Sequence, residues 1–99
     1  MAVDTTAIDE LTVNYEENGE LKVKELQKHV LTKGAWATVM FYYQEMDMKT
    51  KEYKPEKIGI RRYKKRDGRY LPQSKFNISS AAQGHEIARV IGEWYGKPE

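Results

Sequence analysis

The chain has 99 residues, of which 39% are hydrophobic, 32% charged and 11% aromatic, with two histidines and no cysteine. This length supports one domain with a modest core and rules out a multidomain enzyme within these residues. The lack of cysteine excludes disulfides, zinc ribbons, iron–sulfur clusters and thiolate nucleophiles, and favours a reducing compartment. No apolar run approaches the ~20 residues of a membrane span, and the N-terminus lacks the pattern of a signal peptide. We therefore expect a soluble, cytoplasmic protein with no membrane partner.

The net charge of +2 conceals a strong polarisation along the chain. Residues 1–20 contain six acids and no base, whereas residues 49–75 contain eleven bases and three acids, a net charge of +8. A concentrated basic segment attracts polyanions and gains affinity as phosphate counterions are released. The alternative is that these residues only solvate a lysine-rich hairpin.

The N-terminal third is predicted to contain a tail, a turn and a strand. Residues 1–10 are acidic and poor in large apolar side chains, so we expect a disordered tail, followed by a single domain over residues 11–96. Asn18-Gly19 predicts a turn because both residues tolerate positive φ. Leu21 to Leu31 fits both a helical stripe and a strand alternation, and the Gly34 turn that follows favours a hairpin.

The segment from Ala35 to about Met46 is the clearest strand, and both of its faces are apolar or aromatic. Successive side chains on a strand point to opposite faces. One face can enter the core, but so short a chain has little with which to cover the other. The uncovered face must therefore meet a partner subunit, a ligand or water.

A second hairpin follows, with strands over Lys57 to Lys65 and Tyr70 to Ile78. Asp67-Gly68 predicts the tight turn between them. Pro72 has no N–H to donate to a ladder, which predicts an edge strand or a bulge.

Residues 80–95 are predicted to form a helix. Ser80 and Gln83 have the spacing of a capping box, and Gly96 and Pro98 end the element. Four apolar side chains of the helix are expected to pack on one sheet face, namely Ile87, Val90, Ile91 and Trp94 against Val39, Phe41, Ile58, Ile60, Phe76 and Ile78. The predicted fold is α+β, a twisted antiparallel sheet of four to five strands with one C-terminal amphipathic helix.

Residues suited to catalysis are scarce. His29 and His85 do not have metal-ligand spacing, and no glycine-rich phosphate loop is present. Glu45 and Asp47 can share a strand face as paired carboxylates do, but their surroundings offer no further ligand or nucleophile. We therefore predict no enzymatic activity, no metal, no cofactor and no small-molecule substrate.

The sequence does have an excess of strand aromatics interleaved with lysine and arginine. Single-stranded nucleic acid is commonly held by such a combination, because bases stack on aromatic rings while cations follow the phosphates. The predicted nucleic-acid-binding residues are Trp36, Tyr42, Lys54, Lys57, Arg61, Arg62, Tyr63, Lys64, Lys65, Arg66, Arg69, Tyr70 and Lys75. The alternative places Trp36 and Tyr42 in the core. Duplex readout is less favoured because the one helix is net acidic.

Short motifs resemble two families of single-stranded nucleic-acid-binding proteins. Ala37-Thr-Val-Met-Phe-Tyr-Tyr-Gln-Glu, a loop ending Tyr53-Lys54-Pro55, and Lys57-Ile-Gly-Ile resemble the strand, loop, Lys-Pro and Lys-Gly-Ile pattern of the positive-cofactor-four-like transcriptional coactivators. Ser74-Lys-Phe-Asn-Ile-Ser-Ser followed by a helix is similar to the end of Pur-alpha-type repeats. The resemblance, which covers residues 21–95, implies a curved sheet with a helix, a homodimer, and binding of single-stranded DNA or RNA on the sheet in transcription regulation. It also implies that the basic residues from Lys54 to Lys75 contact nucleic acid, although residues 61–75 form an additional arm relative to the coactivator pattern.

From these observations we expect a non-catalytic homodimer that binds single-stranded nucleic acid. The main alternative is a protein–protein interaction module that presents the basic hairpin and an exposed aromatic sheet face to an acidic protein. A further hypothesis is that the acidic N-terminal tail folds back on the basic surface and competes with nucleic acid.

Overall fold

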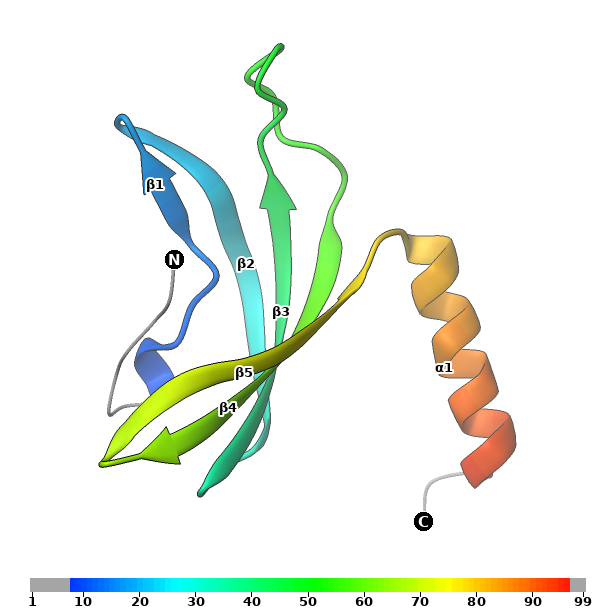
Figure 1. Ribbon diagram of the computed structural model, residues 1–99. Helices are drawn as coiled ribbons and strands as arrows, with labels where there is room; N and C mark the ends of the chain where they lie inside the picture. Colours follow the sequence, from blue (N-terminus) through cyan, green and yellow to red (C-terminus); the bar gives the residue numbers. More distant parts are fainter. Residues whose placement is uncertain (1–7, 97–99) are drawn as a thin grey trace.

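The computed structural model describes residues 8–96 and contains one five-stranded antiparallel sheet followed by one helix (Figure 1). The strands lie in the order in which they occur along the chain, so each pairs with the next. The elements are η1 (Ile8–Glu10), β1 (Tyr15–Glu17), β2 (Glu20–Thr32), β3 (Trp36–Glu45), β4 (Lys57–Arg66), β5 (Arg69–Ile78) and α1 (Ala81–Tyr95). The predicted α+β class and the twisted antiparallel sheet are confirmed.

The tight turns occur where the sequence predicts them. Asn18 and Gly19 have φ values of 54° and 79°, and Asp67 and Gly68 have values of 53° and 78°. Such left-handed conformations match the twist of two-residue hairpins, which is why Asn-Gly and Asp-Gly are favoured there. Local sequence therefore accounts for both turns.

The sheet curls because its strands contain irregularities. β2 has 13 residues against 10 in β3, and its register shifts between Glu25 and Gln27 and again between Val30 and Thr32. A further shift lies opposite Arg62 and Tyr63 of β4, which pair with Ser74 and Pro72 and leave Gln73 of the edge strand β5 as the extra residue. Extra residues of this kind bend a strand and increase its twist. The prediction of an edge strand or a bulge at Pro72 is confirmed, since Pro72 lies beside a register shift in an edge strand.

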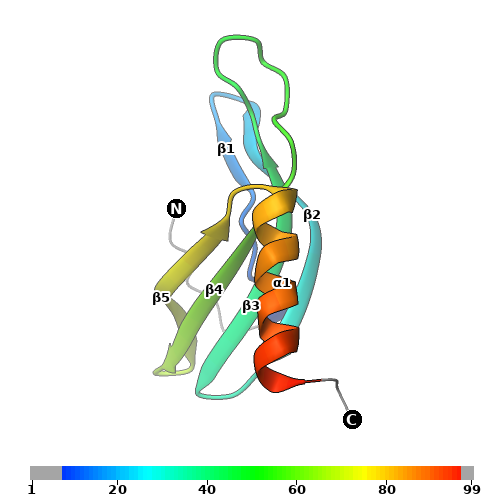
Figure 2. The ribbon, with the colours of Figure 1, turned by 90° about the vertical axis from the view of Figure 1, so that its right-hand side faces the viewer.

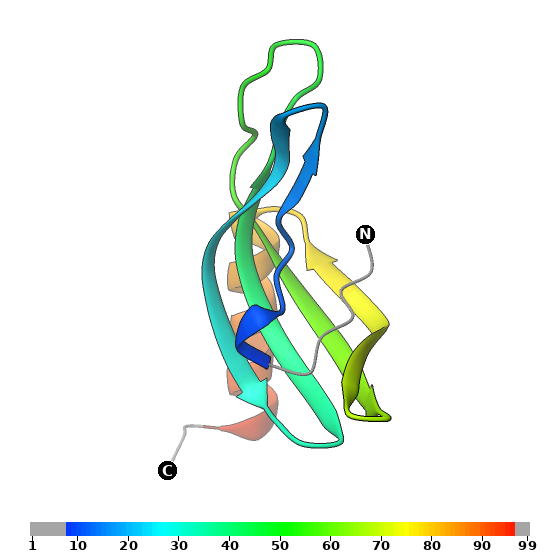
Figure 3. The same ribbon diagram turned by 90° about the vertical axis from the view of Figure 1, so that its left-hand side faces the viewer.

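The core lies on one face of the sheet, which we call the inner face and define by Ala37, Val39, Phe41, Tyr43 and Tyr63. All five side chains are buried, with Phe41 and Val39 at 0% exposure. The N-terminal segment covers this face, since Leu11 is buried in the same cluster and Ile8 packs against it. Figure 3 shows η1 lying across β2 and β3.

Hydrogen bonds hold the N-terminal segment in place. Lys28 Nζ donates to the carbonyl oxygens of Ile8 and Leu11, at 2.8 and 2.7 Å, and Thr12 donates to Glu25 at 2.7 Å. Residues 8–10 of the expected tail are therefore ordered by the core, while residues 1–7 lie outside the described part of the chain. The hypothesis that the acidic N-terminal residues compete with nucleic acid is therefore tested by neutralising the exposed Asp9 and Glu10, which leaves Leu11 in the core.

The expected packing of the helix on the core is wrong. Phe41 of the inner face pairs with Gly59, whereas Ile58 and Ile60 pair with Tyr42 and Met40 on the opposite face. We call this opposite face the outer face, defined by Trp36, Met40, Tyr42, Ile58, Ile60, Phe76 and Ile78. No residue of α1 is buried, and Ile91 and Trp94 are 47% and 82% exposed.

The helix begins and ends as predicted. Ser80 is the N-cap, and its Oγ accepts from the Gln83 amide at 3.2 Å, while Gln83 Oε1 accepts from the Ser79 amide at 2.8 Å. The first bond satisfies a donor that the first turn leaves free, and the second ties Gln83 to the residue before the cap. Gly96 ends the helix with a φ of 78°. No helix between residues 8 and 96 has the length and apolar character needed to cross a membrane.

Candidate nucleic-acid interface

A groove of about 690 Å³ opens on the inner face, between the β1 side of the sheet and the edge strand β5. Tyr43 and Tyr63 form part of its floor, and both rings are almost completely buried. Polar side chains from the β1 edge and the β5 edge of the sheet line its walls. The lining residues are Thr12, Val13, Asn14, Tyr15, Val23, Tyr43, Glu45, Arg61, Arg62, Tyr63, Pro72, Gln73, Ser74, Lys75 and Asn77.

Arg61 is the best-positioned cation of this groove. Its Nη1 donates to Asn77 Oδ1 at 2.7 Å, so the side chain is held across the β4–β5 pair. The guanidinium lies over Gly59, where an added Cβ would be 2.9 Å from Nη1 and 3.2 Å from the ring of Tyr43. The absence of a side chain at Gly59 therefore leaves the space that the guanidinium of Arg61 occupies.

Lys75 lies directly opposite Arg61 in the register of β4 and β5. Like charges in this arrangement destabilise a sheet. Within residues 8–96, no carboxylate lies within salt-bridge distance of either side chain. The β4–β5 hairpin over residues 57–78 carries eight bases and one acid, which adds to the repulsion. An anion between Arg61 and Lys75 would relieve it.

Two of the predicted stacking residues belong to the core. Tyr63 is 4% exposed and Tyr70 5% exposed, and Lys65 Nζ lies 5.5 Å from the centre of the Tyr70 ring. Burial raises the pKa of the Tyr63 hydroxyl above its ordinary value. Neither ring presents an open face on which a base can stack.

Trp36 and Tyr42, the other two predicted stacking residues, lie on the outer face, away from the groove. They are 42% and 37% exposed, so the alternative that buried them in the core is wrong. The guanidinium of Arg62 lies 4.5 Å from the centre of the Trp36 ring, and Lys64 Nζ lies 5.3 Å from it. Four predicted site residues therefore gather around Trp36 and Tyr42 on the outer face, although Arg62 also lines the groove.

The remaining predicted cations are spread over three places. Lys57 forms an ion pair with Glu45 at 2.7 Å, and this hydrogen bond raises the pKa of the lysine. Arg66 and Arg69 face each other across the tip of the β4–β5 hairpin. Lys54 is exposed in the 46–56 loop, beyond the groove.

The 46–56 loop is tied to the β1–β2 hairpin. Lys22 and Lys51 both contact Glu20 Oε1, at 3.0 and 3.1 Å, and the Tyr53 hydroxyl donates to the carbonyl of Leu21 at 2.8 Å. The hydrogen bonds from Lys22 and Lys51 lower the pKa of the Glu20 carboxyl group. The loop and the hairpin thus form one end of the molecule, opposite the basic tip.

The carboxylates considered as a pair have separate structural roles. Glu45 binds Lys57, while Asp47 accepts from the amides of Lys49 and Thr50, at 2.8 and 3.2 Å, and these bonds lower its pKa. Among the described residues, no group of three histidines or carboxylates is placed to hold a metal ion.

Several groove residues were not among the predicted site residues. Tyr15, Asn77 and Tyr43 line the groove, and Tyr15 is the aromatic that remains half-exposed there. Their convergence depends on the curl that brings β1 towards β5. Tyr43 was identifiable as an inward-facing aromatic of β3, but no local signal connects Tyr15 to Asn77.

Comparison with known proteins found no match to a protein-family model, to a curated protein or to a solved structure. The geometry of the groove and of the two sheet faces therefore carries the functional argument.

Proposed function

We propose that this protein binds single-stranded nucleic acid along the groove of the inner face, without catalysis. The observation that carries the proposal is the placement of Arg61 and Lys75 opposite each other at the groove, where each lacks a carboxylate partner among the described residues. A phosphate between them would offset a repulsion that otherwise costs stability.

Arg61 is suited to phosphate because its position is set before binding. Its bond to Asn77 and the space over Gly59 limit the number of conformations that it can adopt. A pre-organised guanidinium loses little entropy on binding and can donate two parallel hydrogen bonds to an anion. Lys75, which is exposed, supplies a second and more adaptable charge.

The walls of the groove offer groups that suit bases. Asn14, Gln73 and Asn77 have amide side chains that both donate and accept hydrogen bonds. Tyr15 is half-buried at the same groove and can contact a base with its ring. Unpaired bases expose their hydrogen-bonding edges and ring faces, whereas duplex bases are already stacked and paired.

The dimensions of the groove favour a single strand over a duplex. Its volume of about 690 Å³ lies within the range of roughly 300–1,000 Å³ typical of sites that enclose small ligands. Unstacked nucleotides can enter such a space. A duplex is instead read by a protein helix or β-ribbon that enters the major groove of the nucleic acid. The one helix here has its N-terminal contact on the outer face and carries a net acidic polar side.

The test is a fluorescence-anisotropy titration of labelled single-stranded and duplex oligonucleotides at two salt concentrations. We expect salt-sensitive binding that prefers the single strand. The double variant Arg61→Glu with Lys75→Glu should weaken it at least about tenfold and reduce the salt slope by about 1.4, for two phosphate contacts.

The matched control reverses two exposed lysines outside the groove, Lys33→Glu with Lys49→Glu, which changes the net charge by the same amount. It should weaken binding much less. An equal loss in both double variants, or no binding at low salt, would refute the groove as the site. Equal binding of poly-glutamate would instead favour a module that recognises an acidic protein.

A further inference from the structure

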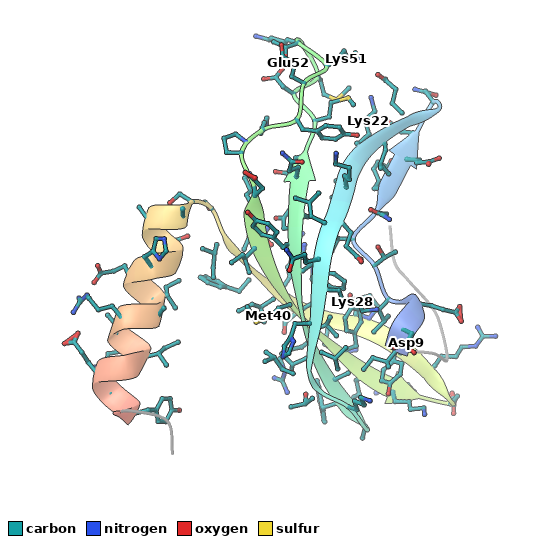
Figure 4. The ribbon with its side chains drawn as sticks, turned by 180° about the vertical axis from the view of Figure 1, so that it is seen from behind. Asp9, Lys22, Lys28, Met40, Lys51 and Glu52 are labelled. Atoms are coloured by element: carbon teal, nitrogen blue, oxygen red, sulfur yellow. The ribbon has the colours of Figure 1, made fainter. Side chains whose placement is uncertain are left out.

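The outer face of the sheet exposes large apolar side chains that nothing in the described chain covers. Phe76 is 53% exposed, Trp36 42% and Tyr42 37%. Figure 4 shows Met40 on the side of the sheet that faces α1, with Lys28 and Asp9 on the opposite side. A contiguous apolar area of this kind is characteristic of an interaction surface.

The helix carries a second unmatched apolar surface. Ile87, Val90, Ile91 and Trp94 follow at helical spacing, so they share one side of α1. Exposure increases along this stripe, from the half-buried Ile87 to Trp94 at 82%, and Tyr95 beside it is 87% exposed. The C-terminal half of the helix is therefore the more exposed half.

The two surfaces approach each other at one end only. A Cβ added to Gly84 would lie 3.4 Å from Ile78 Cγ2, so the first turns of α1 contact the end of β5. Gly84, Ile87 and Ile91 lie on the same side of the helix, since their spacings are three and four. Figure 2 shows α1 running alongside the sheet, and the exposure of Ile91 and Trp94 shows that their side chains do not reach it.

We propose that α1 of a second copy of this chain packs between α1 and the outer face, in a reciprocal two-fold dimer. Such an occupant must be elongated and must present apolar side chains to both surfaces. α1 has these properties, and no described residue covers the C-terminal half of its own apolar stripe. A two-fold axis satisfies both surfaces of both copies at once and closes the assembly at two.

The exposed aromatic side chains supply most of the area that a stable interface needs. Trp36, Tyr42, Phe76, Trp94 and Tyr95 together expose roughly 600 Å² when each aromatic is taken as ~200 Å². Ile91, at 47% exposure, adds to this, and a specific interface buries about 800 Å² on each partner. The radius of gyration is 15.2 Å, against about 13 Å for a compact domain of this length, which is consistent with a chain that completes its packing in an assembly.

Charge also favours α1 as the occupant. The outer face carries Arg62 and Lys64 around Trp36, whereas α1 carries Glu86 and Glu93 against Arg89. The last turn of α1 contains no basic residue, so its partial negative charge remains available to cations. A partner helix would thus bring acidic groups to a basic surface.

The test measures the mass of the full chain by sedimentation equilibrium without nucleic acid. We expect twice the chain mass of 11.6 kDa. Trp94→Glu and Phe76→Glu, which change the two surfaces separately, should each give a monomer at concentrations where the wild type is a dimer. Far-UV circular dichroism establishes whether each variant retains its sheet, and Trp94→Ala is the milder substitution if Trp94→Glu does not fold.

The matched control is Ala82→Glu, which adds the same charge to the side of α1 opposite the apolar stripe and should leave the dimer intact. A monomeric wild type at high concentration would overturn the proposal, because α1 would then close on its own sheet. A dimer that tolerates both Trp94→Glu and Phe76→Glu would overturn it too, since the copies would then meet elsewhere. Neither result depends on whether the inner groove binds nucleic acid.

Discussion

The two faces of the sheet use aromatic side chains in different ways. On the inner face, Phe41, Tyr43 and Tyr63 are buried beneath the N-terminal segment, and the cations stand at the rim of the groove above them. On the outer face, Trp36, Tyr42 and Phe76 stay exposed, with two cations stacked on Trp36. The inner face is therefore a core with a polar groove, and the outer face is an apolar surface that no part of residues 8–96 covers. Our proposals place nucleic acid on the first face and a second copy of the chain on the second.

The largest expected effect comes from replacing one phenylalanine by alanine on each face of the sheet. Phe41 is fully buried, so Phe41→Ala should lower the free energy of unfolding by about 3–5 kcal/mol, a large part of the stability of so small a domain. Phe76 is 53% exposed, so Phe76→Ala should lower the free energy of unfolding of the isolated monomer much less. Urea unfolding followed by circular dichroism measures both.

Protein concentration separates the two variants further. If Phe76 lies in a dimer interface, the midpoint of unfolding rises with concentration in the wild type, and Phe76→Ala reduces that dependence. Phe41→Ala should retain the dependence at its lower stability. Equal losses from the two substitutions at low concentration would contradict the assignment of Phe41 to the core and Phe76 to a surface.

A smaller effect is expected from Gly59→Ala, which tests whether the position of Arg61 in the groove contributes to binding. The new methyl group would lie 2.9 Å from Arg61 Nη1 and 3.2 Å from the buried ring of Tyr43, so the guanidinium must move away from Asn77. The gain in strand propensity opposes the crowding, and we expect a net loss of about 1 kcal/mol. Oligonucleotide affinity should fall several-fold in the anisotropy titration.

The control for this substitution is Gly92→Ala, because nothing lies within 4 Å of a Cβ there. It should leave oligonucleotide affinity unchanged and stabilise the helix slightly. If Gly59→Ala binds as tightly as the wild type, the placement of Arg61 over Gly59 has no part in binding.

The elements that local sequence determines were predicted, and those that depend on distant contacts were not. Asn18-Gly19, Asp67-Gly68 and the Ser80 cap identified turns and the start of α1 because each acts through its own backbone. The alternation of β3 identified two apolar faces, but not which one is the core. That choice depends on Leu11, the first residue of the expected domain, and on Ile8, which lies in the expected disordered tail.

The predicted site residues lie on two faces of the sheet for a related reason. Alternation places Arg61 and Tyr63 on one side of β4 and Arg62 and Lys64 on the other, so a single list of cations spans both faces. The register shift opposite Arg62 and Tyr63 and the curl of β2 then bring Tyr15 to the groove that Asn77 also lines. Pro72 indicates the first of these irregularities, but the sequence contains no local signal for the two shifts in β2.

The smallest expected effect concerns pH and tests the floor of the groove. Because burial raises the pKa of Tyr63 in the folded chain, the unfolded chain loses this proton first, near the ordinary tyrosine pKa of about 10. The contribution of Tyr63 to the free energy of unfolding should therefore be constant at lower pH, and it should be lost as the pH rises above about 10. Urea unfolding at pH 8 and pH 10.5 measures the fall, and Tyr63→Phe should make it smaller. The variant and the wild type are compared first at pH 8, where the hydroxyl is protonated in both states, so any difference there reports packing alone. An equal fall in both proteins would mean that the Tyr63 hydroxyl reaches solvent through the groove, and that the floor is more open than its 4% exposure indicates.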